Sequence, residues 1–173
     1  MRLTAILAGF GLAAVSCIPE AASARENCDV LLGGEENPPV ISDGRGRFRA
    51  NVRNDDTIRY RLRYRFPDGT TVLQAHLHVA NPGNNGGIAA FLCTNVGGSP
   101  NPVPECLSPR DDIRGTIRGA DVQDTLTDDV LVLAEGDLDG LVKLIEDGAV
   151  YVNVHTADHT GGELRCQVNP RRR

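Results

Sequence analysis

Tryptophan is absent from this chain of 173 residues, methionine occurs once, and aromatic residues make up only 4%. A hydrophobic core must therefore consist mainly of valine, leucine, isoleucine and alanine. The sequence shows no internal repeat, no phosphate-binding loop and no Asn-x-Ser/Thr acceptor for glycosylation. No apolar run is long enough to cross a bilayer as a helix. Serine is scarce, and the sequence shows no nucleophile paired with a base, so no catalytic residue can be assigned.

The net charge of −5 argues against general binding to nucleic acids, and the charges are unevenly distributed. Residues 45–65 contain eight arginines and two acids, whereas residues 105–147 contain twelve acids and four basic residues. The arginine-rich segment could form a surface that binds a polyanion, or the two segments could be solvated faces that balance each other. The candidate polyanion surface consists of Arg47, Arg49, Arg59, Arg61, Arg63 and Arg65.

The N-terminal residues have the pattern of a secretory signal. Arg2 supplies a positive start, residues 3–15 form a short apolar run, and Ala22-Ser23-Ala24 fits a cleavage site. We therefore predict a signal peptide at residues 1–24, one domain at residues 25–170 and a basic tail at residues 171–173. The predicted location is secreted or periplasmic. Lipid anchoring through Cys17 is the alternative, although the leucine usual three positions before the cysteine is missing.

Four cysteines remain after removal of the predicted signal, and in an exported chain they indicate two disulfides. Cys93 and Cys106 flank a loop rich in glycine, proline and asparagine, so we pair them. Cys28 and Cys166 are then joined, and both are in phase with apolar neighbours, Cys28 with Val30 and Leu32. Metal binding by the four thiols is the competing interpretation, but no CxxC spacing is present.

Alternating apolar and charged residues predict an antiparallel hairpin formed by residues 46–54 and 57–66. Several short strands follow, separated by turns rich in glycine, proline and asparagine. Residues 137–147 form the one plausible helix, with Asp137 as its cap. This pattern predicts an all-β fold, a Greek-key or immunoglobulin-like sandwich or barrel with one short helix.

A second hairpin, at residues 149–168, carries the most unusual polar face in the chain. Valines alternate with Tyr151, Asn153 and His155, and after a turn Leu164, Cys166 and Val168 alternate with further polar residues. Successive side chains of a strand point to opposite faces, so one face is apolar and the other gathers groups that bind ligands or relay protons.

Histidines at positions 76, 78 and 155 form the candidate site. His76 and His78 alternate with the apolar Leu73, Ala75, Leu77 and Val79, so both imidazoles lie on the polar face of one strand. If that strand neighbours the one that carries His155, three imidazoles converge in an arrangement that suits copper or zinc. The alternative is a hydrogen-bonded polar cluster that binds nothing. Four further residues would support this candidate site, namely Asn153, His159, Glu163 and Arg165.

Five segments, taken in order, resemble the chordin-type domain, called CHRD. They are Glu36-Asn37-Pro38-Pro39-Val40, Ala75-His76-Leu77-His78, Gly86-Gly87-Ile88, residues 148–156 with the sequence GAVYVNVHT, and Gly162-Glu163-Leu164-Arg165. Together they span nearly all of residues 25–170. The family usually has glycine where Cys166 stands here, and this departure agrees with an added terminal disulfide.

The resemblance implies a secreted or surface β-sandwich domain. The family occurs in animal chordin, an extracellular antagonist of bone morphogenetic proteins, and in many bacterial exported proteins. It implies no enzyme activity, so no catalytic residue is transferred to this chain. The expected function is a non-enzymatic binding or structural module of a bacterial exported protein, whose partner is an extracellular protein or a polysaccharide. The alternative is a protein that binds copper or zinc, with a possible redox role.

Overall fold

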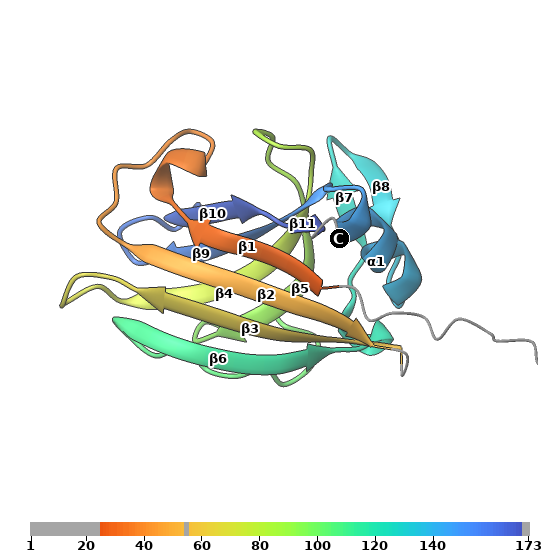
Figure 1. The fold of residues 1–173 in the computed structure, drawn as a ribbon, viewed down its shortest axis with the longest axis horizontal. Helices are drawn as coiled ribbons and strands as arrows, with labels where there is room; N and C mark the ends of the chain where they lie inside the picture. The colour runs from red at the N-terminus through yellow and green to blue at the C-terminus, as the bar shows by residue number, and fades with distance from the viewer. Residues whose placement is uncertain (1–24, 54–55, 171–173) are drawn as a thin grey trace, which may run out of the picture.

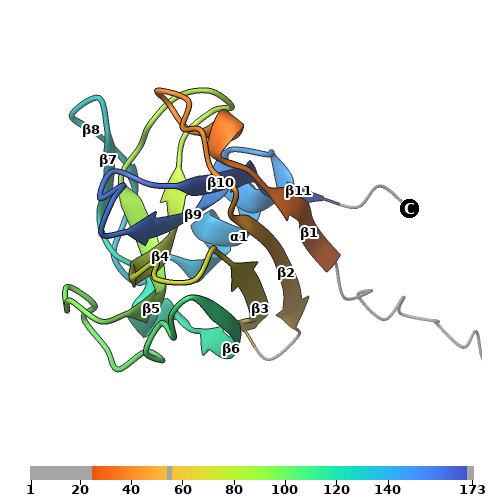
Figure 2. The ribbon, with the colours of Figure 1, turned by 90° about the vertical axis from the view of Figure 1, so that its left-hand side faces the viewer.

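The computed structural model describes residues 25–53 and 56–170, which fold into two antiparallel sheets packed face to face (Figures 1 and 2). The first sheet has the strand order β11 (Asn169–Pro170), β1 (Arg25–Leu31), β2 (Arg45–Arg53), β3 (Thr57–Arg65) and β6 (Arg110–Ile117). The second has the order β10 (Leu164–Gln167), β9 (Val150–Thr156), β4 (Val72–Val79) and β5 (Ile88–Thr94). The predicted all-β sandwich is confirmed, and the sheets of the described residues do not close into a barrel.

The predicted signal peptide, Cys17 and the basic tail lie outside the described residues. Within the described residues, no helix is long and apolar enough to cross a membrane.

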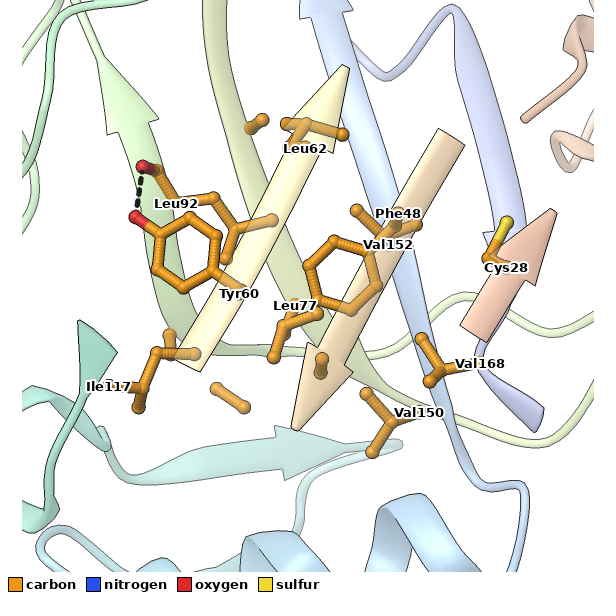
Figure 3. Packing of buried hydrophobic residues seen from close by; sticks show 14 of the residues in the cluster. Cys28, Phe48, Tyr60, Leu62, Leu77, Leu92, Ile117, Val150, Val152 and Val168 are labelled. Atoms are coloured by element: carbon orange, nitrogen blue, oxygen red, sulfur yellow. Dashed lines mark hydrogen bonds between the residues drawn. The ribbon is translucent and has the colours of Figure 1, made fainter. Parts of the chain in front are cut away.

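The core lies between the two sheets, where each sheet contributes its apolar face. Alternation in β2 and β3 directs Phe48, Tyr60 and Leu62 inward, against Leu77 and Val152 of the second sheet (Figure 3). These residues are at most 5% exposed. The hydroxyl of Tyr60 donates a hydrogen bond of 2.7 Å to the carbonyl of Leu92 on β5, which gives this buried phenol a partner in the opposite sheet.

Short elements complete the fold. The predicted helix is confirmed as α1 (Leu138–Glu146), whose N-cap Asp137 accepts a hydrogen bond from the amide of Gly140. Its buried residues Leu138, Leu141 and Ile145 join the core cluster. A small hairpin of β7 (Thr125–Thr127) and β8 (Val130–Leu133) precedes it, and two short 3-10 helices, η1 (Gly33–Glu35) and η2 (Gly119–Asp121), lie in the connections.

Simple alternation assigns two positions to the wrong face. Val30, expected in phase with Cys28, is 46% exposed, while Leu31 is buried, because the register of β1 against β2 shifts between Cys28 and Leu31. A similar shift at the start of β4 buries Val72 and leaves Leu73 only partly buried. Both errors arise at a bulge, where the period of two is interrupted.

Both predicted disulfides are present in the structure. Cys28 on β1 bonds Cys166 on β10, with Cα atoms 6.0 Å apart and a sequence separation of 138. Cys93 and Cys106 close the shorter loop, with Cα atoms 5.3 Å apart. The first bond links one strand of each sheet, so it joins the two layers at their edge.

Candidate metal centre

The three predicted histidines come from neighbouring strands of the second sheet. β4 pairs with β9 in antiparallel register, which places His76 opposite Asn153, His78 opposite Tyr151 and Gln74 opposite His155. Because Leu77 and Val79 on β4 point into the core, the alternate residues His76 and His78 point to the outer face of the sheet. The adjacency of strands on which the predicted convergence depends is therefore present.

The three imidazoles form a compact group. Ring centroids are 5.3 Å apart for His76 and His78, 4.8 Å for His76 and His155, and 6.1 Å for His78 and His155. One nitrogen from each ring can be chosen so that all three lie within 4.8 Å of one another. We call His76, His78 and His155 the histidine trio. Among the described residues, no other group of three or more histidines, cysteines or carboxylates lies this close together.

Although the trio lies on an outer sheet face, it is buried. His76 is 0% exposed, His155 6% and His78 9%. Loop 81–87 contributes one layer of the cover, since the Gly86 carbonyl lies 2.9 Å from Nδ1 of His78 and the Gly86 amide donates to the Tyr151 hydroxyl. A Cβ atom at Gly86 would lie 1.8 Å from the carbonyl oxygen of Val79, so only glycine fits this close approach.

The loop that joins β9 to β10 covers the trio on another side. The Thr160 carbonyl lies 2.9 Å from Nδ1 of His155. A carbonyl can only accept, so Nδ1 of His78 and of His155 each carry the proton, and each Nε2 atom is left with a free lone pair. Both of these Nε2 atoms and both ring nitrogens of His76 are buried without a hydrogen-bond partner in the structure.

Burial keeps these imidazoles neutral. Removal from water lowers the pKa of all three, and the nearby His155 and His78 lower that of His76 further. The pKa of His78 falls from 6.5 to about 4, even though its bond to the Gly86 carbonyl raises it. Neutral imidazole is the form that binds metal ions.

An aromatic and cationic layer surrounds the trio. The ring of Phe91 meets that of His76 edge-on at 4.4 Å, and Tyr151 stacks on His78 at 4.8 Å. The guanidinium carbon of Arg165 lies 3.5 Å from the centroid of the Tyr151 ring. Arg165 is 2% exposed, and it also donates to Asn85 and to the carbonyl of Asn84 in the covering loop. The side chains around the trio are thus fixed from several directions.

Glu36 is a buried acid that the sequence interpretation did not include among the candidate site residues. It lies just after η1 and is 7% exposed, and its Oε2 accepts a hydrogen bond of 3.0 Å from the side-chain amide of Asn153. Burial raises its pKa from 4.5 to about 7, while the charge of Arg165 and the Asn153 bond act in the opposite direction. The sequence feature that could have pointed to Glu36 is its place in the first CHRD-like segment.

The four predicted supporting residues fall into two groups. Asn153 and Arg165 lie opposite each other on β9 and β10, on the face that carries the trio. Glu163 instead accepts hydrogen bonds from the hydroxyls of Ser42 and Thr156, and His159 is half-buried in the loop and is not part of the trio. The six candidate arginines lie elsewhere, on β2 and β3 of the first sheet.

The trio fits a bound copper or zinc ion. Zinc holds imidazole nitrogens at about 2.0–2.1 Å, so two nitrogens on one ion lie no more than about 4 Å apart. A spread of up to 4.8 Å therefore needs only a small inward rotation of the rings. Nδ1 protons fixed by carbonyl groups and buried, unpartnered Nε2 atoms are the arrangement that orients imidazole toward a metal.

Fold and site together define an all-β sandwich with two disulfides and a buried histidine trio on the outer face of one sheet. The family model of the CHRD domain matches residues 29–168, which is most of the chain. The chain therefore belongs to the CHRD family. No curated protein and no solved structure matches it significantly.

Proposed function

We propose that this chain is an exported, non-enzymatic CHRD module that holds one copper or zinc ion in the histidine trio. The observation that carries the proposal is the set of three converging imidazoles with buried, unpartnered nitrogens. An unsatisfied buried polar group costs about 1–3 kcal/mol. Leaving several of them together is costly unless a ligand accepts their lone pairs.

Export is supported by the two disulfides, which are compatible with an extracellular or periplasmic location. In this proposal residues 1–24 are removed and residues 25–170 act as one domain. His76, His78 and His155 would hold the ion, and the carbonyls of Gly86 and Thr160 would orient two of the rings. The ion would supply a Lewis acid or, in the case of copper, a redox centre.

The test is titration of metal-stripped protein with Cu(II) and Zn(II), followed by calorimetry and by thermal unfolding. We expect one ion per chain and a rise in the unfolding temperature, because an ion present at about 100 times its Kd stabilises the native state by about 2.7 kcal/mol. His155→Gln should abolish tight binding. His159→Gln is the matched control, because it removes a histidine of the same chain outside the trio, and it should bind as the wild type does.

The double variant His76→Gln with His155→Gln guards against residual binding by two imidazoles. If the wild type binds either ion no more tightly than this double variant, the proposal is wrong. Elemental analysis of the purified protein then shows which metal it retains, and a redox role requires that metal to be copper.

A further inference from the structure

The outer face of the first sheet, on the opposite side of the molecule from the trio's sheet, carries an array of arginines. β2 pairs with β3 so that Arg45 faces Arg65, Arg47 faces Arg63 and Arg49 faces Arg61. β3 pairs with β6 so that Arg61 faces Arg114 and Arg65 faces Arg110. The intervening residues Phe48, Leu62 and Ile113 are buried in the core, so these arginines point outward. The arginine array comprises Arg45, Arg47, Arg49, Arg61, Arg63, Arg65, Arg110 and Arg114.

The array works against folding. Like charges directly opposite on neighbouring strands are destabilising, and five such pairs occur here. A sheet whose outer face served only as a solvated surface would alternate acids with bases. The like-charge pairs do not themselves stabilise the sheet, which agrees with a requirement other than stability for arginine at these positions.

Few carboxylates neutralise the array. Asp112 pairs with Arg61 and Arg63, and at the end of the sheet Arg110 pairs with Asp68. These pairs are exposed, so each contributes little to stability. Arg45 and Arg47 donate hydrogen bonds to backbone carbonyl groups. These bonds orient each guanidinium group, but a carbonyl does not neutralise its positive charge. Within residues 25–53 and 56–170, no carboxylate forms an ion pair with Arg49, Arg65 or Arg114.

The array is also hollowed along its length. A groove of about 730 Å³ is lined in part by Arg45, Arg47, Arg63, Arg65 and Arg110, with Asp29, Asp111 and Asp112 along it. Arg47 and Arg63 also line a small depression, together with Arg49 and Arg61. Arg49 and Arg61 also line a third hollow of about 310 Å³, shared with Asn27, Asn51 and Arg59. The three hollows share arginines of β2 and β3, so all of them lie along the arginine array.

We propose that the arginine array binds a linear anionic polysaccharide through its carboxylate or sulfate groups. Guanidinium groups bind such oxyanions with paired, charge-assisted hydrogen bonds. Residues 45–51 alone extend over about 20 Å at about 3.3 Å per residue, which is long enough to contact several sugars of an extended chain. The acids between residues 121 and 147, which lie outside the first sheet, repel a polyanion there and so help to restrict contact to this face.

The composition of the face favours a polysaccharide over single-stranded nucleic acid. Sequence-independent binding of single strands uses aromatic side chains on which bases stack. The aromatic residues of β2 and β3, namely Phe48, Tyr60 and Tyr64, point inward and are at most 5% exposed. The array therefore presents charge and hydrogen-bond donors with no stacking platform.

The experiment compares retention on immobilised heparin and binding to polygalacturonate, at several salt concentrations, for three forms of the protein. The first is the wild type, and the second carries Arg49→Gln with Arg65→Gln, which removes two arginines that form no ion pair with a carboxylate of the described residues. The control is Lys143→Glu on α1, which changes the net charge by the same amount outside the array. We expect the double variant to bind at least tenfold more weakly, with a salt dependence reduced by about two charges, while the control binds as the wild type does.

Thermal unfolding checks that the double variant is folded, and removal of like-charge contacts should leave its melting temperature unchanged or raised. Arg49→Gln alone provides a second variant with a smaller expected loss. Equal binding by the wild type and the double variant, or an equal loss in Lys143→Glu, would overturn the proposal. Tighter binding of oligonucleotides than of both polysaccharides would overturn it as well.

Discussion

Replacement of Glu36 by glutamine should remove a pH-dependent loss of stability from the metal-free protein. Glu36 is buried beside Asn153, and its carboxyl has a pKa of about 7 in the folded chain against 4.5 in the absence of the fold. Between these two pH values the native state keeps a proton that the unfolded state has released. The free energy of unfolding must therefore decrease as the pH rises through this interval.

The size of the effect follows from the two pKa values. Each pKa unit corresponds to about 1.4 kcal/mol, so a rise of the pKa from 4.5 to about 7 means that ionisation of Glu36 in place costs at most about 3.5 kcal/mol above pH 7. Glutamine has nearly the same shape as the protonated acid and cannot ionise. Glu36→Gln should therefore match the wild type near pH 5 and exceed its stability near pH 8.

Urea unfolding of the disulfide-bonded, metal-free protein from pH 5 to pH 8 measures this difference directly. Glu35→Gln is the matched control, because the neighbouring Glu35 is exposed, and its curve should follow that of the wild type at every pH. If the difference between Glu36→Gln and the wild type is the same at pH 5 and pH 8, Glu36 does not titrate as its burial requires.

Two further predictions concern the disulfides and the loop over the trio. Serine at both Cys28 and Cys166, whose bond spans 138 positions, should cost about 5 kcal/mol in the chain-entropy account, against about 3 kcal/mol for Cys93 and Cys106 with a separation of 13. Urea unfolding measures both values, and a larger loss from the shorter loop would contradict this ranking. Gly86→Ala should weaken copper or zinc binding by about 10–100-fold in calorimetry, because the new Cβ displaces the carbonyl that orients His78. Gly34→Ala, with open space at its Cβ position, is the control and should bind as the wild type does.

Regular alternation explains why so much of the sandwich could be predicted from the sequence. β2 and β3 alternate apolar and polar or charged residues without interruption, and their full register is observed. β1 and the start of β4 could not be assigned correctly from the pattern, because a bulge reverses the faces at Val30 and Leu73. A bulge is set by pairing with the neighbouring strand, and that information is absent from the strand's own sequence.

The candidate site was predictable where its residues lie on strands and unpredictable where they lie in loops. The i, i+2 spacing placed His76 and His78 on one face, and the pairing of β4 with β9 brings the predicted His155 beside them. Glu36 lies 117 positions from Asn153, in an irregular segment without periodicity. The same limit applies to the burial of the trio, because the covering loops have no pattern that indicates where they fold.

Burial of the trio connects metal binding to the order of the loops above it. The Nδ1 proton of His78 is held by the Gly86 carbonyl and that of His155 by the Thr160 carbonyl, and each carbonyl belongs to one of the two covering loops. These two bonds set the orientation of the rings. Loop 81–87 is held in turn by Arg165, and Asn37, next to Glu36, exchanges hydrogen bonds with Gly83 and Asn85. An ion cannot reach the nitrogens unless part of this cover opens, and once bound it satisfies the atoms that the cover leaves without partners. Exchange of amide hydrogens in both loops should therefore slow when metal binds, whereas exchange in β2 and β3, beneath the arginine array, should not change.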